Sequence, residues 1–185
     1  MTRPILYREK RKTIPMLPRL LREIHIMSPF DMTLQNETFL QANDGDDDKI
    51  LIFASRRHLS SLANTKNVFC DGTFYCAPQL FAQMYTIHGE VCGHSFPLLY
   101  SFLPNKSNET YQRLFEKVRD LLNLHNFHIR WEKVLTDFET AAQRAFATVF
   151  ANVSLKGCNF HYGKALWRKI QALGLASVSI HFRIL

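Results

Sequence analysis

Two aspartates lie at the ends of strand-like runs, where a charged carboxylate next to apolar residues requires a structural or functional explanation. Asp71 follows an apolar run that ends at Cys70 and precedes Gly72, while Asp137 follows the run 133–136. Taken singly, each has a structural explanation, because Asp before Gly is typical of a turn and Asp ahead of a helix is a common N-cap. Taken as a pair, adjacent carboxylates repel each other and are retained where something positive compensates. Both interpretations stay open, and the pair is a candidate metal site.

A pair of carboxylates can bind divalent cations, and these cations catalyse phosphoryl transfer. Mg²⁺ and Mn²⁺ favour hard oxygen ligands, and Mg²⁺ keeps open positions for phosphate and water. Two such ions about 3.5–4 Å apart stabilise both the attacking and the leaving oxygen of a phosphoryl displacement. Asp71 and Asp137 are therefore the expected catalytic and metal-binding residues, and a third acid normally completes the site of the second ion.

A second group of aspartates, at positions 44, 46, 47 and 48, precedes a strand-like run at 50–53. These carboxylates alternate loosely, but the calcium-loop pattern D-x-[DN]-x-[DN]-G with a distant Glu is absent. The segment therefore favours an acidic loop over a calcium site.

The net charge of +7 is distributed unevenly along the chain. Residues 1–22 carry seven basic and one acidic side chain, residues 140–185 carry six basic and no acidic ones, and residues 23–139 carry ten basic against fifteen acidic. Two basic ends around an acidic centre suit a polyanion held across a carboxylate site, although solvated surface charge explains them equally well. The candidate nucleic-acid-binding residues are Arg8, Lys10, Arg11, Lys12, Lys164, Arg168 and Lys169.

Composition narrows the class of protein. The chain has 185 residues, of which 46% are hydrophobic, so it has enough apolar side chains for a sizeable core. No apolar run approaches the ~18 residues of a membrane span, and the basic start has no apolar segment typical of a secretory signal. The four cysteines form no C-x-x-C pair and predict reduced, buried thiols. A nuclear or cytoplasmic protein that is not secreted is expected.

The predicted elements supply a topology that brings the two aspartates together. Three strands in an antiparallel meander precede helix, strand, helix, strand and helix, so the order β-β-β-α-β-α-β-α predicts a mixed α/β sheet. The right-handed crossover after the third strand places the fourth strand parallel to the first and beside it. Asp71 and Asp137 would then be neighbours. The expected strands are 68–75, 79–90, 94–103, 133–136 and 154–158, and the expected helices are 108–124, 138–150 and 160–173, with short helices at 17–26 and 55–63.

Two local signals refine these elements. Pro97 lies inside the third strand and indicates either a bulge or an edge position. The helix at 138–150 is expected to bury one apolar face, which comprises Phe138, Ala142, Ala145, Phe146 and Val149.

Four groups of residues carry a resemblance to a known family. They are Asp71-Gly72-Thr73-Phe74 with Pro78, Leu103-Pro104-Asn105-Lys106 with Glu109-Thr110-Tyr111, Thr136-Asp137-Phe138-Glu139 with Ala141, and Cys158-Asn159-Phe160-His161. In this order they resemble the MULE (Mutator-like element) transposase domain over about 67–175, roughly three-fifths of the chain. The resemblance implies a ribonuclease-H-like fold and metal-dependent DNA transposition by an Asp-Asp-Glu set, with Asp71 and Asp137 as its two aspartates.

The resemblance also shows what this chain lacks. Glu139 is its last acidic residue, so the third acid that the family places well downstream is absent. We expect a C-terminally incomplete domain without transposase activity of its own, unless Glu90, Glu139 or a partner supplies the acid. Cys158 and His161 match the family's C-x-x-H element near the active site. Zinc would need two further ligands, which favours a buried Cys and a hydrogen-bonded His at a helix start.

The expected layout has three parts. Residues 1–63 form a basic arm and a short α/β pre-region, residues 64–175 form the partial MULE-like domain, and residues 176–185 form a divergent tail that altered splicing or a frameshift would explain. DNA is the expected ancestral partner, with a homo-oligomer or a protein partner covering the truncated face. A domesticated protein-interaction module is the remaining alternative.

Overall fold

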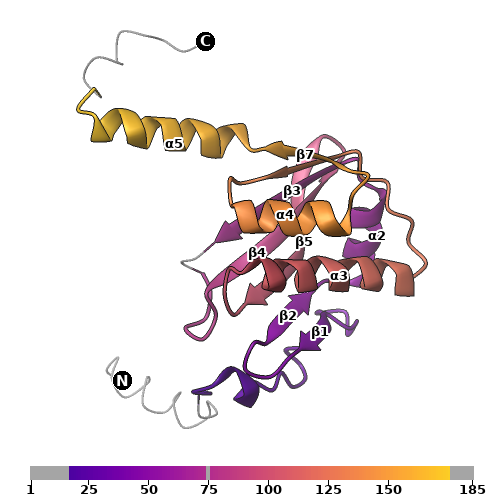
Figure 1. Cartoon of the computed structure of the whole chain (residues 1–185). Helices are drawn as coiled ribbons and strands as arrows, with labels where there is room; N and C mark the ends of the chain where they lie inside the picture. Colours follow the sequence, from indigo (N-terminus) through magenta and orange to yellow (C-terminus); the bar gives the residue numbers. More distant parts are fainter. Residues whose placement is uncertain (1–16, 74–75, 176–185) are drawn as a thin grey trace, which may run out of the picture.

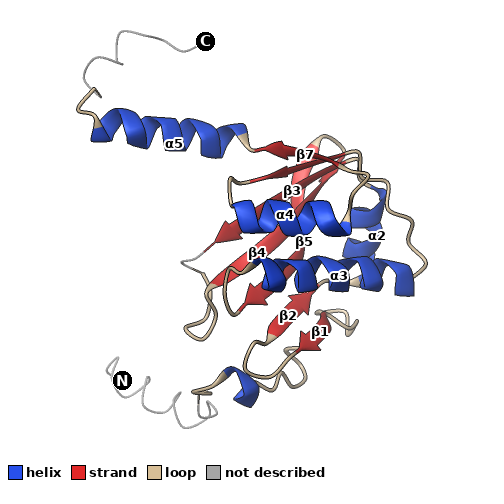
Figure 2. Cartoon of the chain, in the orientation of Figure 1, coloured by secondary structure: helices blue, strands red, loops and turns tan. Residues whose placement is uncertain are grey.

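The computed structural model describes residues 17–73 and 76–175. Its centre is a mixed sheet of seven strands, drawn as red arrows in Figure 2, in the order β1-β2-β5-β4-β3-β6-β7. The strands are β1 (Leu40–Asp44), β2 (Ile50–Phe53), β3 (Asn67–Thr73), β4 (Gln83–Val91), β5 (His94–Leu103), β6 (Lys133–Thr136) and β7 (Ser154–Gly157). The helices in these residues are α2 (Arg56–Asn64), α3 (Asn108–Leu124), α4 (Thr140–Val149) and α5 (Asn159–Ala172), preceded by a 3-10 turn, η1 (Leu21–Glu23).

The central strands have the predicted arrangement. Strands β3, β4 and β5 form an antiparallel meander. The chain then passes through α3 to β6, which pairs in parallel with β3, and β7 pairs in parallel with β6 on the outer side. The predicted parallel placement of the strand at 133–136 beside the first strand of the meander is therefore confirmed.

Two further strands extend this sheet on its other side. Strand β2 pairs with β5, and β1 pairs with β2, both antiparallel. The sequence pattern indicates β2 but not β1, because a register irregularity between Leu40 and Ala42 interrupts the regular alternation of β1. Residues 40–53 thus belong to the same sheet as the central strands.

Three helices cover one face of the sheet. Side chains of α2, α3 and α4 join those of β2 to β6 in one apolar cluster, and α3 and α4 lie across the sheet in Figure 1. Helix α3 contributes Tyr111, Phe115 and Val118, which are buried at the i, i+4, i+7 spacing of an amphipathic helix. Helix α5 differs, because every residue from Tyr162 to Leu175 is exposed except the half-buried Ile170. Figure 1 shows α5 extending away from the sheet beyond β7.

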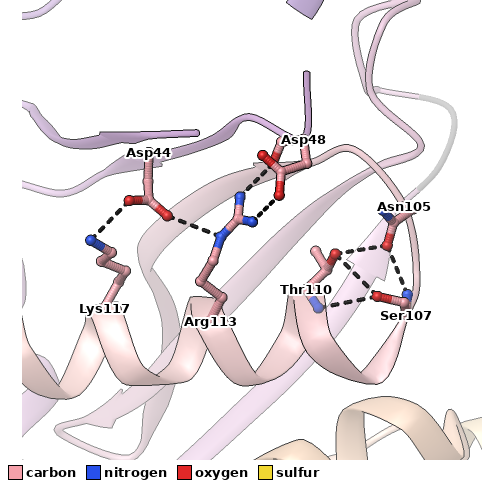
Figure 3. A network of polar contacts seen from close by, with 7 residues as sticks. All are labelled: Asp44, Asp48, Asn105, Ser107, Thr110, Arg113 and Lys117. Atoms are coloured by element: carbon pink, nitrogen blue, oxygen red, sulfur yellow. Dashed lines mark hydrogen bonds and ion pairs between the residues drawn. The ribbon is translucent and has the colours of Figure 1, made fainter. Parts of the chain in front are cut away.

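The start of α3 is fixed by a local cap (Figure 3). The hydroxyl of Ser107, the N-cap residue, accepts a hydrogen bond from the backbone N–H of Thr110 at 3.2 Å. The Asn105 carboxamide oxygen accepts from the Ser107 N–H at 2.9 Å and from the Thr110 hydroxyl at 2.7 Å. These bonds satisfy groups that a helix start leaves open, so the predicted boundary at 108 is confirmed.

The acidic segment at 44–48 is held against α3 by basic side chains (Figure 3). Asp44 forms ion pairs with Arg113 Nε and Lys117 Nζ, each at 2.9 Å, while the Arg113 guanidinium also binds Asp48. The hydrogen bond from Arg113 holds the pKa of Asp48 below its ordinary value. Two of the four aspartates therefore serve as partners of α3, which supports the acidic-loop interpretation over a calcium site.

Three predicted boundaries are wrong. The helix expected at 17–26 is only the single turn η1, which buries no residue and so has no packing partner. The strand expected from residue 79 begins at Gln83, because a turn closed by the Phe81 N–H and the Pro78 carbonyl precedes it. The helix expected from residue 138 begins at Thr140 and leaves Phe138 53% exposed instead of buried.

Two smaller points concern Pro97 and the cysteines. Pro97 lies opposite His88 at an irregularity in the β4–β5 pairing, so the bulge is confirmed. Strand β2 pairs with β5 only at residues 100–102, so Pro97 itself has no partner from β2 on its other side. Cys70 is buried, but Cys76 and Cys92 are exposed, so the expectation of buried thiols is wrong for these two. None of the described helices is long and apolar enough to span a bilayer.

Candidate metal site on the neighbouring strands β3 and β6

Asp71 and Asp137 lie side by side on neighbouring parallel strands. Asp71 lies in β3, Asp137 directly follows β6, and the pairing of Cys70 with Thr136 puts the two next residues side by side. Burial raises the pKa of the Cys70 thiol to about 12, and the negative charges of Asp137 and Asp71 both add to this shift. Both carboxylates therefore act on one buried atom, which supports their closeness.

Asp71 faces away from the helices. Cys70 and Thr136 are buried on the face that α2, α3 and α4 cover, and successive side chains of a strand point to opposite faces. Asp71 consequently points to the other face, where its cross-strand neighbour is Thr86. The Thr86 hydroxyl donates to the Asp71 carbonyl at 3.2 Å. Both aspartates are half-buried, so water and a ligand can reach them.

Asp71 and Gly72 do not form a turn. Both residues lie within β3 and pair with β4, which makes the turn interpretation of this dipeptide wrong. Gly72 is required for a different reason, because a Cβ there would lie 2.6 Å from the Gln83 carboxamide oxygen. Gln83 is fully buried and donates to the Tyr111 hydroxyl at 2.5 Å, so it has little room to move. The glycine lets β3 approach this buried pair closely.

Asp137 combines a helix-start role with its place beside Asp71. Its Oδ1 atom accepts from the Glu139 N–H at 3.3 Å, and its backbone carbonyl accepts from Gln143 Nε2 at 2.8 Å. Glu139 is itself the N-cap residue of α4 and makes no side-chain cap bond. The capping interpretation of Asp137 is therefore partly correct, and it leaves the second carboxylate oxygen for another ligand.

The two carboxylates fit a divalent cation. They offer hard oxygen ligands that are half-buried and within reach of solvent, and Mg²⁺ commonly binds through one or two carboxylates together with waters and substrate phosphates. Within residues 17–73 and 76–175, no group of three His, Cys, Asp or Glu side chains is arranged to hold a metal ion. A bound ion would therefore rest on Asp71 and Asp137, with other oxygen ligands from outside this pair.

Neither substitute acid completes a group of three metal ligands among the described residues. Glu90 accepts a hydrogen bond from Asn67 at 2.7 Å, at the opposite end of β3, which is four residue steps or about 13 Å from Asp71. Glu139 lies 4.0 Å from Lys106. Burial raises the pKa of the Tyr111 phenol, and the nearby Glu139 adds to this shift. The proximity of Gln83, Tyr111 and Glu139 has no local signal in the sequence, because these residues come from β4, α3 and the start of α4.

The remaining candidate residues are scattered. Cys158 is half-buried, and its N–H donates to the Thr136 carbonyl at 2.8 Å, which joins the start of α5 to the end of β6. The side chain of His161 lies outside the described residues. Lys164, Arg168 and Lys169 are exposed on α5. The other four basic candidates, Arg8, Lys10, Arg11 and Lys12, also lie outside the part of the chain that the structure describes.

Fold and site together indicate a class of protein. A mixed sheet with helices on one face and two carboxylates at the ends of its central parallel strands is consistent with a ribonuclease-H-like fold. The family model of the MULE transposase domain matches residues 67–165, which is more than half of the chain and includes Asp71, Asp137, Cys158 and His161. The chain therefore belongs to the MULE transposase domain family. A search of curated proteins found no match to it.

Proposed function

We propose that this chain is a transposon-derived ribonuclease-H-like domain that binds a divalent cation through Asp71 and Asp137, binds nucleic acid without sequence preference, and does not cut DNA by itself. The observation that carries the proposal is the side-by-side placement of two half-buried aspartates on the neighbouring strands β3 and β6. A bound Mg²⁺ or Mn²⁺ would supply charge neutralisation and Lewis acidity for phosphodiester chemistry. The two described carboxylates hold the ion, and no third described side chain completes the set.

Nucleic-acid binding is supported by the charge of the last described helix. Lys164, Arg168 and Lys169 are exposed on α5, and no acidic side chain lies between residues 140 and 185. Phosphate contacts made by such side chains give affinity without sequence information. A protein-interaction module without a nucleic-acid role would instead show no DNA binding, or binding that salt does not weaken.

A nicking assay on supercoiled plasmid with Mg²⁺ or Mn²⁺ tests the catalytic part of the proposal. The intact chain is expected to give no nicking above the level of the Asp71→Ala variant. Robust nicking that disappears in Asp71→Ala would overturn the inactive assignment.

Binding of Mn²⁺, followed by electron paramagnetic resonance, tests the metal site separately. It is expected to be lost in Asp71→Asn and retained in Asp120→Asn, a control on an exposed carboxylate that pairs with Arg119.

An active nuclease that uses Glu139 as third acid is the second candidate. It is supported by one observation, which is that Glu139 and Asp137 both act on the buried Tyr111 hydroxyl and so lie near each other. If the nicking assay shows activity, the variant Glu139→Gln decides between the candidates. Loss of nicking in both Asp71→Ala and Glu139→Gln would establish the second candidate, whereas nicking that Glu139→Gln leaves unchanged would exclude it.

A further inference from the structure

The loop between β5 and α3 carries an exposed lysine, Lys106, which closes the motif Leu103-Pro104-Asn105-Lys106. Its Nζ atom lies 4.0 Å from Oε1 of Glu139, the N-cap residue of α4. The Lys106 side chain is 40% exposed and that of Glu139 is 19% exposed. Solvent screens an ion pair of this kind, and such pairs stabilise a fold only weakly. Attachment of the loop to α4 is therefore a minor effect of this contact.

The backbone that carries Lys106 is constrained on both sides. The Asn105 carboxamide oxygen accepts hydrogen bonds from the Ser107 N–H at 2.9 Å and from the Thr110 hydroxyl at 2.7 Å, and Ser107 caps α3 (Figure 3). Pro104, the residue before Asn105, has a restricted φ. The Lys106 side chain thus reaches solvent from a backbone with little freedom. A side chain on such a backbone loses less freedom when it binds a ligand.

Glu139 connects Lys106 to the candidate metal site. The Glu139 N–H donates to Asp137 Oδ1 at 3.3 Å, and Asp71 lies beside Asp137 through the pairing of β3 with β6. Glu139 thus contacts the Asp137 carboxylate with its backbone and the Lys106 ammonium with its side chain. Lys106 therefore adds a positive charge at the end of the sheet where the two aspartates lie, although it comes from a different element.

The charges of these residues make phosphate binding dependent on a metal ion. At neutral pH the carboxylates of Asp71, Asp137 and Glu139 carry three negative charges and Lys106 carries one positive charge, so the group repels a phosphate. One divalent cation brings the net charge to zero, and the ion and the ammonium are then two positive centres for a phosphate. Lysine is a common phosphate ligand in proteins. The three donor protons of an ammonium allow it to contact a carboxylate and a phosphate oxygen together.

We propose that Lys106 binds a phosphate of the nucleic acid that is held by the metal ion at Asp71 and Asp137, and that Glu139 positions the Lys106 ammonium for this contact. The inference rests on the proposed function, because it needs both the ion and the nucleic acid. It differs from phosphate binding by α5, whose basic side chains neutralise phosphates with or without the ion. Because Lys106 contributes only when the ion is bound, the ion and the nucleic acid each strengthen the binding of the other by the same factor.

The ratio of DNA affinity with and without Mn²⁺ measures this coupling. Fluorescence anisotropy of a labelled DNA duplex with the full chain, in Mn²⁺ or in EDTA at constant ionic strength, gives the ratio. Mn²⁺ is expected to tighten wild-type binding by about fivefold or more, and Lys106→Gln is expected to lose most of this gain. Lys106→Arg keeps the charge and should retain the gain. The matched control Lys66→Gln removes an exposed lysine that pairs with Glu132 at 2.7 Å, and it should keep the wild-type ratio.

Three results would refute this inference and leave the metal site standing. They are a wild-type ratio in Lys106→Gln, an equal loss of affinity in this variant with and without Mn²⁺, and a wild-type chain that binds Mn²⁺ without any change in DNA affinity. A Lys106→Arg variant as weak as Lys106→Gln would also contradict it, because the charge would then not be what matters.

Electron paramagnetic resonance of Mn²⁺ without DNA separates these results from a failure of the proposed function. The Lys106→Gln variant is expected to bind Mn²⁺ at least as tightly as wild type, because a positive charge near the ion is removed. Weaker Mn²⁺ binding in this variant would show a structural role of Lys106 and would overturn the inference. A wild-type chain that binds no Mn²⁺ would refute the proposed function, and this inference with it.

Discussion

A buried hydrogen bond lies beside the aspartate pair and gives three residues a role. Gln83 donates to the Tyr111 hydroxyl, which joins β4 to α3. Tyr111 is completely buried, and its burial raises the pKa of the phenol well above its ordinary range. Gly72 allows β3 to lie against this buried pair.

The substitution Tyr111→Phe tests the hydrogen bond between Gln83 and Tyr111. It removes one hydroxyl and leaves the buried Gln83 amide without its acceptor, so the free energy of unfolding is expected to fall by about 1–3 kcal/mol. Urea denaturation followed by circular dichroism measures the change. The control Tyr162→Phe alters a tyrosine that is 58% exposed on α5 and is expected to change stability by less than about 0.5 kcal/mol. Equal effects of the two substitutions would contradict a structural role of the Tyr111 hydroxyl.

Two glycine substitutions are expected to have opposite effects. Gly72→Ala places a Cβ 2.6 Å from the Gln83 oxygen, and because Gln83 is held by Tyr111 the expected loss is about 1–3 kcal/mol. Gly163→Ala meets nothing within 4 Å and lies inside α5, where Ala favours the helix by up to about 1 kcal/mol. Thermal unfolding followed in the far ultraviolet measures both changes. A stable Gly72→Ala variant would mean that Gln83 moves aside freely.

At the scale of elements, the β1–β2 hairpin is attached to α3 by charge. Arg113 of α3 binds both Asp44 and Asp48, and Lys117 binds Asp44 on its other oxygen. Asp44 is the more enclosed of the two carboxylates, with its side chain 25% exposed against 59% for Asp48. The contact with Asp44 is therefore expected to contribute most of the stabilisation, because solvent screens the outer pair.

The substitution Arg113→Lys keeps the charge but removes the planar fork that reaches two carboxylates at once. The expected loss of stability is about 1 kcal/mol near neutral pH. The pKa of Asp48 is lowered in the folded chain, so its contribution is present above the ordinary pKa of 3.8 and is lost as the pH falls through the folded value. The difference between wild type and variant should therefore shrink in acid. Urea titrations at pH 7 and pH 3 measure it, and a difference that grows at pH 3 would contradict the assignment.

The sequence predicts correctly those elements whose signals are local, and it does not predict contacts between distant parts of the chain. The bounds of β5, α3 and β6 are correct because each has its own periodicity, and α3 also has the Ser107 cap. The pairing of Asp44 with Arg113 spans distant parts of the chain and has no local signal. The helix expected at 17–26 is wrong for the converse reason, since its local pattern has no packing partner. The same holds for the candidate site. The order of the strands predicts that Asp71 and Asp137 are neighbours, whereas the need for glycine at position 72 depends on the conformation of Gln83, which the sequence does not predict.

At the scale of the whole molecule, charge and apolar surface are separated on α5. Lys164 and Arg168 lie on the side of the helix opposite the stripe formed by Tyr162, Leu166, Ile170 and Leu173. Metal binding at Asp71 and Asp137 and phosphate binding through the basic side of α5 therefore involve different atoms.

The double substitution Lys164→Gln/Arg168→Gln tests the binding of DNA phosphates by α5. Affinity for duplex DNA should weaken similarly for unrelated sequences, because these side chains bind the backbone and not the bases. The slope of log K against log salt concentration should become less steep by about 0.9 for each phosphate that the variant no longer neutralises. Fluorescence anisotropy with a labelled duplex at several salt concentrations measures both. The control Lys66→Gln removes an exposed charge that pairs with Glu132 at 2.7 Å, and it should leave the slope unchanged. A double variant with the wild-type slope would place the DNA-binding surface elsewhere on the molecule, while an equal decrease in the Lys66→Gln variant would show a response to net charge alone.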